Sequence, residues 1–320
     1  VIVIMFGALL WLCMVEGGQG ALVGLPPVDR ELYKDSHKIT HKICSTAHKG
    51  DNLDRYLMGR QFLVIFIVFI VEMCGSPIAG ETLYWLPDWA SNLFLTSGLA
   101  MILFTVQLGK VPSQVTASHM MLDYINNYFS LFTVYVALAL EFSGILHSSY
   151  VMAMIVAKLS RKPIESNEPP RSLTQNIFFW LRCAMSLALL GFALAVTLEA
   201  LFQGQTTMWE GVPNWASVIL FFFFMSIVGF LEAMQIAFFA VTKMTKDEQG
   251  DHYFAKKTCH LLFKGKGHNL PSFMIGRQLC VTLCFFIIAR VTTLNVETGT
   301  GQNIFGVSDP IQNFFNTGLM

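Results

Sequence analysis

The chain has 320 residues, of which 54% are hydrophobic and 13% charged, and its formal net charge at pH 7 is zero. So large an apolar share is unusual for a soluble domain and typical of a protein with several membrane spans. The balanced charge gives no reason to expect a nucleic-acid partner, and the apolar runs are too continuous for the alternating strands of a membrane β-barrel. The composition predicts an all-α polytopic membrane protein in a lipid bilayer.

Several apolar runs are about 20 residues long, the length that a helix needs to cross the bilayer. The run at 125–157 is long for one helix, which leaves three interpretations: a strong tilt, a break at Gly144, or two short crossings. The chain begins and ends in apolar sequence, so we expect a fragment truncated at both ends. The predicted spans lie near 1–25, 57–75, 89–109, 125–157, 176–202, 215–242 and 272–291, with an eighth beginning near 305.

Two polar loops, at about 27–56 and 243–271, are rich in lysine and histidine. In the first loop, His37 and His41 are one helical turn apart, a spacing that metal sites use. A solvated basic loop explains the same residues, and these two histidines are only weak candidates for an unknown metal.

Two polar motifs, Glu-x-x-Gln and Gly-Arg-Gln, each occur twice and in the same order. The copies are Glu16-x-x-Gln19 and Glu232-x-x-Gln235, at an offset of 216 residues (232 − 16), and Gly59-Arg60-Gln61 and Gly276-Arg277-Gln278, at an offset of 217 (278 − 61). An ordered series at a nearly constant offset predicts an internal duplication. The first repeat covers 1–216 and lacks its first span, and the second covers 217–320 and is truncated.

The number of spans in one period determines how the two repeats are oriented. The spans from 57–75 through 215–242 make an odd period, which predicts an inverted 5+5 repeat and about ten spans in the full protein. Both polar loops are basic, however, and the positive-inside rule would place both in the cytoplasm. If 125–157 crosses twice, the period becomes even and the repeats are parallel.

The repeated polar residues lie at or within apolar runs, where each charge costs about 2.5–3.5 kcal/mol on insertion scales. One interpretation is structural: Glu16 with Arg60, and Glu232 with Arg277, would fasten each helical hairpin. The other is a polar site near the midplane, where equivalent motifs of inverted repeats can converge. Glutamine amides both donate and accept hydrogen bonds, which suits a small, neutral, hydroxyl-rich solute, and the glycines would permit close approach. The candidate substrate-binding residues are Glu16, Gly17, Gln19, Gly59, Arg60, Gln61, Glu232, Gln235, Gly276, Arg277 and Gln278.

Enzyme motifs do not stand out in the chain. We find no nucleophile elbow, P-loop or dinucleotide fingerprint, and no set of clustered histidine boxes of the kind that membrane di-iron enzymes use. We therefore expect no catalytic residue and no cofactor. A metal-dependent membrane enzyme is the less favoured alternative, and a channel for a small neutral solute stays open.

The paired motifs carry a specific resemblance. Glu-Gly-x-Gln followed by Gly-Arg-Gln, written twice, resembles the diatom silicon (silicic acid) transporter family; residues 16–19 read EGGQ and both triplets fit. Residues 232–235 read EAMQ, with Ala at the position where the family has Gly. Residues 120–123 read MMLD, where the family has Cys-Met-Leu-Asp. The resemblance implies sodium-coupled symport of orthosilicic acid across the plasma membrane by alternating access, with sodium as the coupling ion. A homo-oligomer is left open.

Overall fold

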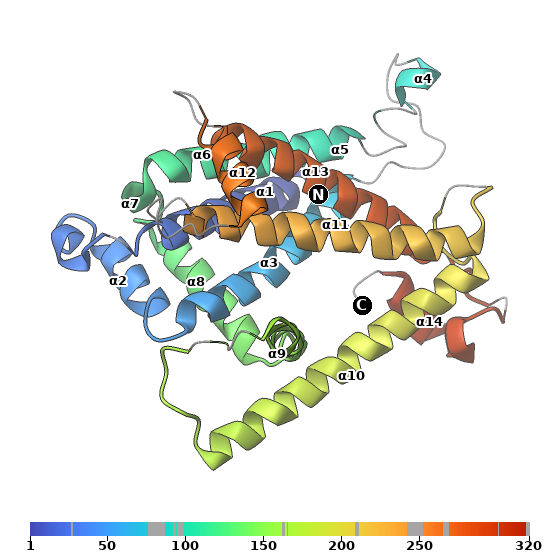
Figure 1. Ribbon diagram of the computed structural model, residues 1–320. Helices are drawn as coiled ribbons and strands as arrows, with labels where there is room; N and C mark the ends of the chain where they lie inside the picture. The colour runs from blue at the N-terminus through green and yellow to red at the C-terminus, as the bar shows by residue number, and fades with distance from the viewer. Residues whose placement is uncertain are drawn as a thin grey trace. The chain divides into compact units, whose positions relative to one another are not determined.

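A computed structural model describes residues 1–26, 28–75, 87–91, 94, 99–161, 164, 166–208, 211–241, 252–264, 269–299 and 301–317 (Figure 1). Regular structure in these ranges is helical, apart from one isolated antiparallel bridge between Thr206 and Leu294. The predicted all-α class is confirmed.

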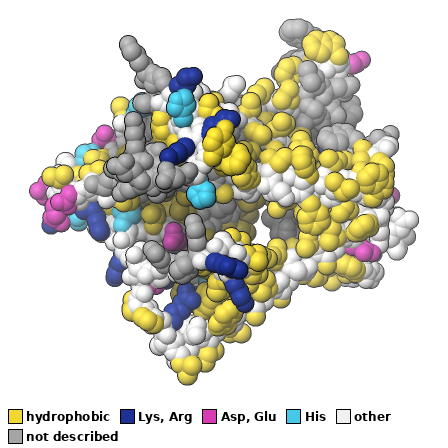
Figure 2. Space-filling model, viewed as in Figure 1, with side chains coloured by type: hydrophobic (Ala, Val, Ile, Leu, Met, Phe, Trp, Pro, Cys, Tyr) yellow, Lys and Arg dark blue, Asp and Glu magenta, His cyan; other side chains and the backbone are white. Residues whose placement is uncertain are grey.

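Five of the described helices are long and apolar enough to cross a membrane. They are α1 (Ile2–Gly24), α3 (Asn52–Gly75), α10 (Leu173–Gln203), α11 (Asn214–Val241) and α13 (Leu270–Thr292). Many of their large apolar side chains are exposed, and hydrophobic side chains cover much of the visible face in Figure 2. Such surfaces suit lipid and not water. The chain is an integral, polytopic membrane protein.

The chain divides into two compact units, 1–189 and 190–320, and the division falls inside α10. Besides α1 and α3, the first unit holds several shorter elements. They are η1 (Arg30–Tyr33), α2 (Lys38–Ala47), α4 (Asp88–Ser91), α5 (Leu99–Phe104), η3 (Thr105–Lys110), α6 (Val111–His119), α7 (Met121–Tyr124), α8 (Tyr128–Phe142) and α9 (Ser148–Ser160).

The centre of the first unit is an antiparallel hairpin of α1 and α3, to which a third helical run adds. This run joins α5, the π-helical segment η3 and α6 without a break, from Leu99 to His119. It follows α1 in the same direction: Phe104 meets Phe6, and Leu108 accepts a hydrogen bond from Cys13. The helix thus continues ten residues past the predicted end of the span at 109.

The apolar run at 125–157 is broken at Gly144, one of the three interpretations that the sequence allows. Gly144 has φ +89°, a conformation that glycine adopts without strain, and it separates α8 from α9. With 15 and 13 residues, these helices measure roughly 22 and 20 Å, short of the roughly 30 Å of a hydrocarbon core.

The second unit contains a hairpin of α11 and α13 with the short helix α12 (Tyr253–Leu262) between them in sequence. A small apolar cluster holds the end of α10 to the segment after α13, and it includes Val196, Leu294 and Phe315. Near the predicted eighth span, the described residues form η4 (Ile304–Gly306) and α14 (Asp309–Asn316), which has only eight residues.

The order long helix, short helix, long helix occurs in both units at the offset of the repeated motifs. Helix α2 shifted by 215 residues gives the bounds of α12, and α3 shifted by 217 ends where α13 ends. The two units do not have the bounds of the predicted repeats, 1–216 and 217–320, and the duplication stays a prediction. Part of the second polar loop, at 242–251 and 265–268, lies outside the described residues.

Candidate functional site

The carboxylate of Glu16 is the centre of a buried charge network in the first unit. Arg60 Nη1 donates to Glu16 Oε2 at 3.4 Å, and Lys110 Nζ lies 3.6 Å from Glu16 Oε1. Gln114 Nε2 donates to the same Oε2 at 3.3 Å. The side chains of Glu16, Arg60 and Lys110 are 4%, 2% and 1% exposed, so this is a buried site and not a surface salt bridge.

Lys110 has a second acidic neighbour. Glu72, near the end of α3, is close enough to Lys110 for their charges to interact. The four charges therefore alternate in sign, in the order Arg60, Glu16, Lys110 and Glu72. Alternation reduces the penalty for burying each charge, because every group has an opposite charge beside it.

A stripe of small residues explains how the third helical run comes so close to α1. Gly109, Ser113 and Ala117 are spaced four residues apart and are all buried. A Cβ added to Gly109 would lie 2.9 Å from a methyl carbon of Leu12. Small residues at this spacing let membrane helices approach closely. The π-helical segment that ends at Lys110 is also a feature often found at functional sites.

The two candidate glutamines of the first hairpin have different surroundings. Gln61 is half-buried, and its Oε1 accepts a hydrogen bond of 2.7 Å from Arg60 Nη2. Gln19 is 1% exposed, and its Oε1 has no hydrogen-bond partner within the described part of the chain. Such a buried acceptor costs about 1–3 kcal/mol when it stays unpaired, so its position needs an explanation.

The candidate glycines of this hairpin have packing partners. A Cβ on Gly59 would lie 1.8 Å from the carbonyl oxygen of Ala137 in α8, and one on Gly17 would lie 2.4 Å from the ring of Tyr124. Both glycines therefore bring other protein segments close, which is a sufficient reason for their presence. The close approach that we expected of these glycines is thus made to other protein segments, and their part in binding a solute stays a prediction.

The second hairpin repeats the ion pair in a simpler form. Arg277 Nη1 donates to Glu232 Oε1 at 3.2 Å, and the arginine is fully buried while the glutamate side chain is 21% exposed. Gln235 is 1% exposed, and among the described residues its Oε1 has no partner, as for Gln19. Gln278 is also buried, whereas Gly276 is exposed with nothing near its Cβ position.

The histidine pair of the first polar loop has other partners. His37 Nε2 lies 3.0 Å from Asp123 Oδ1, and its Nδ1 lies 2.8 Å from the Ser36 hydroxyl. His41 packs edge-on against Tyr33. No group of three or more metal-binding side chains is found in the ranges that the structure describes.

The sequence interpretation missed Lys110 and Gln114 because both follow the predicted end of a span at 109. Their signal was the small-residue stripe, which continues the helical period to Ala117 past the last strongly apolar residues. The sequence interpretation correctly paired Glu16 with Arg60 and Glu232 with Arg277.

The chain matches the family model described as "Silicon transporter" over residues 1–320, and it belongs to this family. No curated protein and no solved structure matches it. The chain is thus a membrane transporter of silicon, as the motifs suggested. Membership of this family implies a role in transport and not in catalysis.

Proposed function

We propose that the chain is a sodium-coupled carrier that moves orthosilicic acid across the plasma membrane by alternating access. The observation that carries the proposal is the pair of buried glutamine oxygens at equivalent positions. Gln19 and Gln235 lie one helical turn after Glu16 and Glu232, and within the described residues neither Oε1 accepts a hydrogen bond.

Orthosilicic acid is a small, uncharged molecule whose surface consists of hydroxyl groups. Each hydroxyl donates one hydrogen bond and can accept others, so a buried amide oxygen is a suitable partner. The carboxylate of each hairpin is already engaged by its arginine, which favours a neutral solute over an ion. In this proposal the ion pairs hold the frame and the glutamines Gln19, Gln61, Gln235 and Gln278 contact the solute.

Contacts within the first unit also support a membrane topology. Helix α8 begins against α2, where Asn126 Oδ1 accepts from the backbone N–H groups of Ile39 and Thr40, and its last turn lines a cavity beside Asn52 at the start of α3. The start of α8 thus lies beside α2, and its last turn lies near the start of α3. The first turns of α10 line the same cavity.

We therefore count α8 and α9 as no crossing. If the run 99–119 crosses as α1, α3 and α10 do, the described residues hold four crossings in one period, an even number, which favours the parallel alternative over the inverted repeat. In this topology the basic loops at 27–56, 158–175 and 243–271 all face one side, as the positive-inside rule requires. Cysteines placed in these three loops should be labelled from the same side of sealed vesicles, whereas opposite labelling of the first and third would restore inversion.

The transport mode is tested in proteoliposomes. A symporter accumulates silicic acid above its external concentration when an inward sodium gradient is applied, and accumulation stops when potassium replaces sodium. If uptake is the same in both salts and ends at equilibrium, the protein is a channel and the proposal is wrong.

A further inference from the structure

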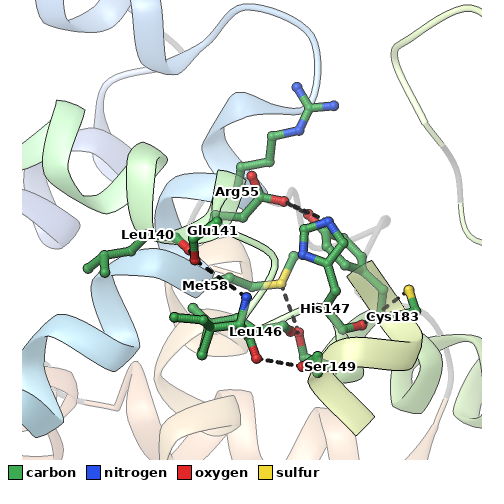
Figure 3. Close-up of polar contacts among 12 residues, drawn as sticks. Arg55, Met58, Leu140, Glu141, Leu146, His147, Ser149 and Cys183 are labelled. Carbon is green, nitrogen blue, oxygen red and sulfur yellow. Dashed lines mark hydrogen bonds and ion pairs between the residues drawn. The ribbon is translucent and has the colours of Figure 1, made fainter. Parts of the chain in front are cut away.

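The first unit contains a cavity of about 970 Å³ that is separate from the Glu16 network. It lies between the start of α3, the last turn of α8, the α8–α9 turn and the segment that leads into α10. None of Glu16, Gln19, Arg60 and Gln61 lines it. Figure 3 shows part of this region, with Arg55, Glu141 and His147 near one another.

The cavity has an excess of positive charge. Four basic side chains line it, against two carboxylates. Both carboxylates have partners: Glu168 accepts from Arg55 at 2.6 and 2.9 Å, and Glu141 accepts from the Tyr150 hydroxyl at 2.8 Å. The basic residues are Lys49, Arg55, Arg171 and Arg182.

Two of the arginines are held in place by aromatic rings. The guanidinium of Arg171 lies 4.0 Å from the centre of the Phe179 ring, and that of Arg182 lies 4.4 Å from the centre of the Phe142 ring. Within the described ranges, no carboxylate forms a salt bridge with either one. A guanidinium stacked on a ring keeps its N–H edge available, and that edge fits phosphate oxygens.

A buried imidazole completes the cavity wall. His147 is 3% exposed, and its Nδ1 has no hydrogen-bond partner within the part of the chain that the structure describes. Hydrogen bonds to α10 hold the backbone around His147. The Cys183 thiol donates to the His147 carbonyl oxygen, and the Ser186 hydroxyl donates to the Ile145 carbonyl oxygen and accepts from the Ser148 N–H. An anion in the cavity would be an acceptor for Nδ1 in the protonation states that carry a proton there, while Nε2 lies 3.9 Å from Glu141 Oε1.

We propose that this cavity binds a phosphate group through Arg171, Arg182 and His147. Its remaining wall is apolar, with Leu138, Phe178 and the Pro169-Pro170 pair, so the phosphate of a lipid headgroup fits better than a bare ion. The starts of α3 and α10 both lie here, which places the cavity at the level of the headgroups if these helices cross the bilayer. A bound lipid would connect the segment before α10 to the start of α3.

The test measures binding to the purified chain in a neutral detergent. Phosphatidic acid, phosphatidylcholine and inorganic phosphate are titrated separately, and the unfolding midpoint and the lipid retained in native mass spectra are recorded. We expect saturable binding of phosphatidic acid, weakened roughly tenfold or more by Arg171→Gln and further by R171Q/R182Q. Arg171 is exposed, so its single variant should fold normally. Arg30→Gln, an exposed arginine of the same unit outside the cavity, is the matched control and should bind as wild type.

Binding of inorganic phosphate alone with the same arginine dependence would assign the site to a free anion and keep the phosphate chemistry. Two results would overturn the proposal: no saturable binding of any of the three probes, or binding that R171Q and R30Q weaken equally.

Discussion

The two hairpins carry the same motifs in different surroundings. In the first, Glu16 contacts Arg60, Lys110 and Gln114, and all three charged groups are buried. In the second, Glu232 pairs with Arg277 and remains 21% exposed. The repeated motif thus specifies the pair in both hairpins, and in the first hairpin the run 99–119 adds two further contacts to the carboxylate.

The glycines of the two triplets show the same contrast. Gly59 lies directly against the backbone of α8, and Gly276 faces open space. One triplet thus serves as a contact between helices, while the identical triplet of the other hairpin has no such contact among the described residues.

Loss of the central carboxylate should give the largest effect. Glu16→Gln leaves Arg60 buried without an anion, and breaking a buried pair costs about 3–5 kcal/mol. Glu232→Gln should cost less, because the Glu232 carboxylate is 21% exposed and solvent screens this pair. Unfolding of both variants in detergent measures the difference. Equal losses would show that the third helix adds nothing to the first pair.

Replacing the glycine of each triplet by alanine should give the next largest difference in stability between the two hairpins. Gly59→Ala pushes a Cβ into the carbonyl oxygen of Ala137, and such overpacking costs about 1–3 kcal/mol. Gly276→Ala meets nothing and should stabilise α13 by up to about 1 kcal/mol, since alanine is the better helix former. The midpoints of thermal unfolding should move in opposite directions. A destabilised Gly276→Ala would contradict the open surroundings of this position.

Lowering the pH should have a smaller effect on stability, confined to the contact between Asp51, in the loop of the first hairpin, and residues 166–168. The Ser166 hydroxyl, at 2.5 Å, and the Asn167 N–H hold the pKa of Asp51 below its usual value, and the hydrogen bond from Arg55 lowers the pKa of Glu168. A lowered carboxylate pKa contributes stability that is complete above the unfolded pKa, about 4, and is lost as the pH falls through the folded one.

Hydrogen exchange at 166–168 should therefore accelerate between about pH 5 and pH 3 beyond the intrinsic trend. Asp51→Asn should reduce this dependence to the part that Glu168 contributes through Arg55. The position equivalent to Asp51 is His268, outside the described residues, so the acid response is expected in one loop only. A pH dependence unchanged in Asp51→Asn would contradict the assignment.

The sequence predicted the long helices and both ion pairs, because continuous apolar runs and isolated charges within them are strong, local signals. The break at Gly144 was among its alternatives, although the sequence could not select it. It missed Lys110, whose helix continues past the apolar run through packing of Gly109, Ser113 and Ala117 on α1. It also could not assign the glycines, because Gly59 and Gly276 differ only in what other elements bring near them.

The central claim, that Gln19 and Gln235 accept hydrogen bonds from silicic acid, is tested most directly by replacing each with leucine and measuring two quantities. Without solute, neither variant should lose stability, since an unpaired buried oxygen is removed. Stabilisation of the purified chain by silicic acid, and the apparent affinity of uptake, should both fall roughly 3- to 10-fold per substitution. Gln107→Leu, an exposed glutamine of η3, should behave as wild type in both measurements. Full silicic acid stabilisation and uptake affinity in the Gln19→Leu and Gln235→Leu variants would contradict the account.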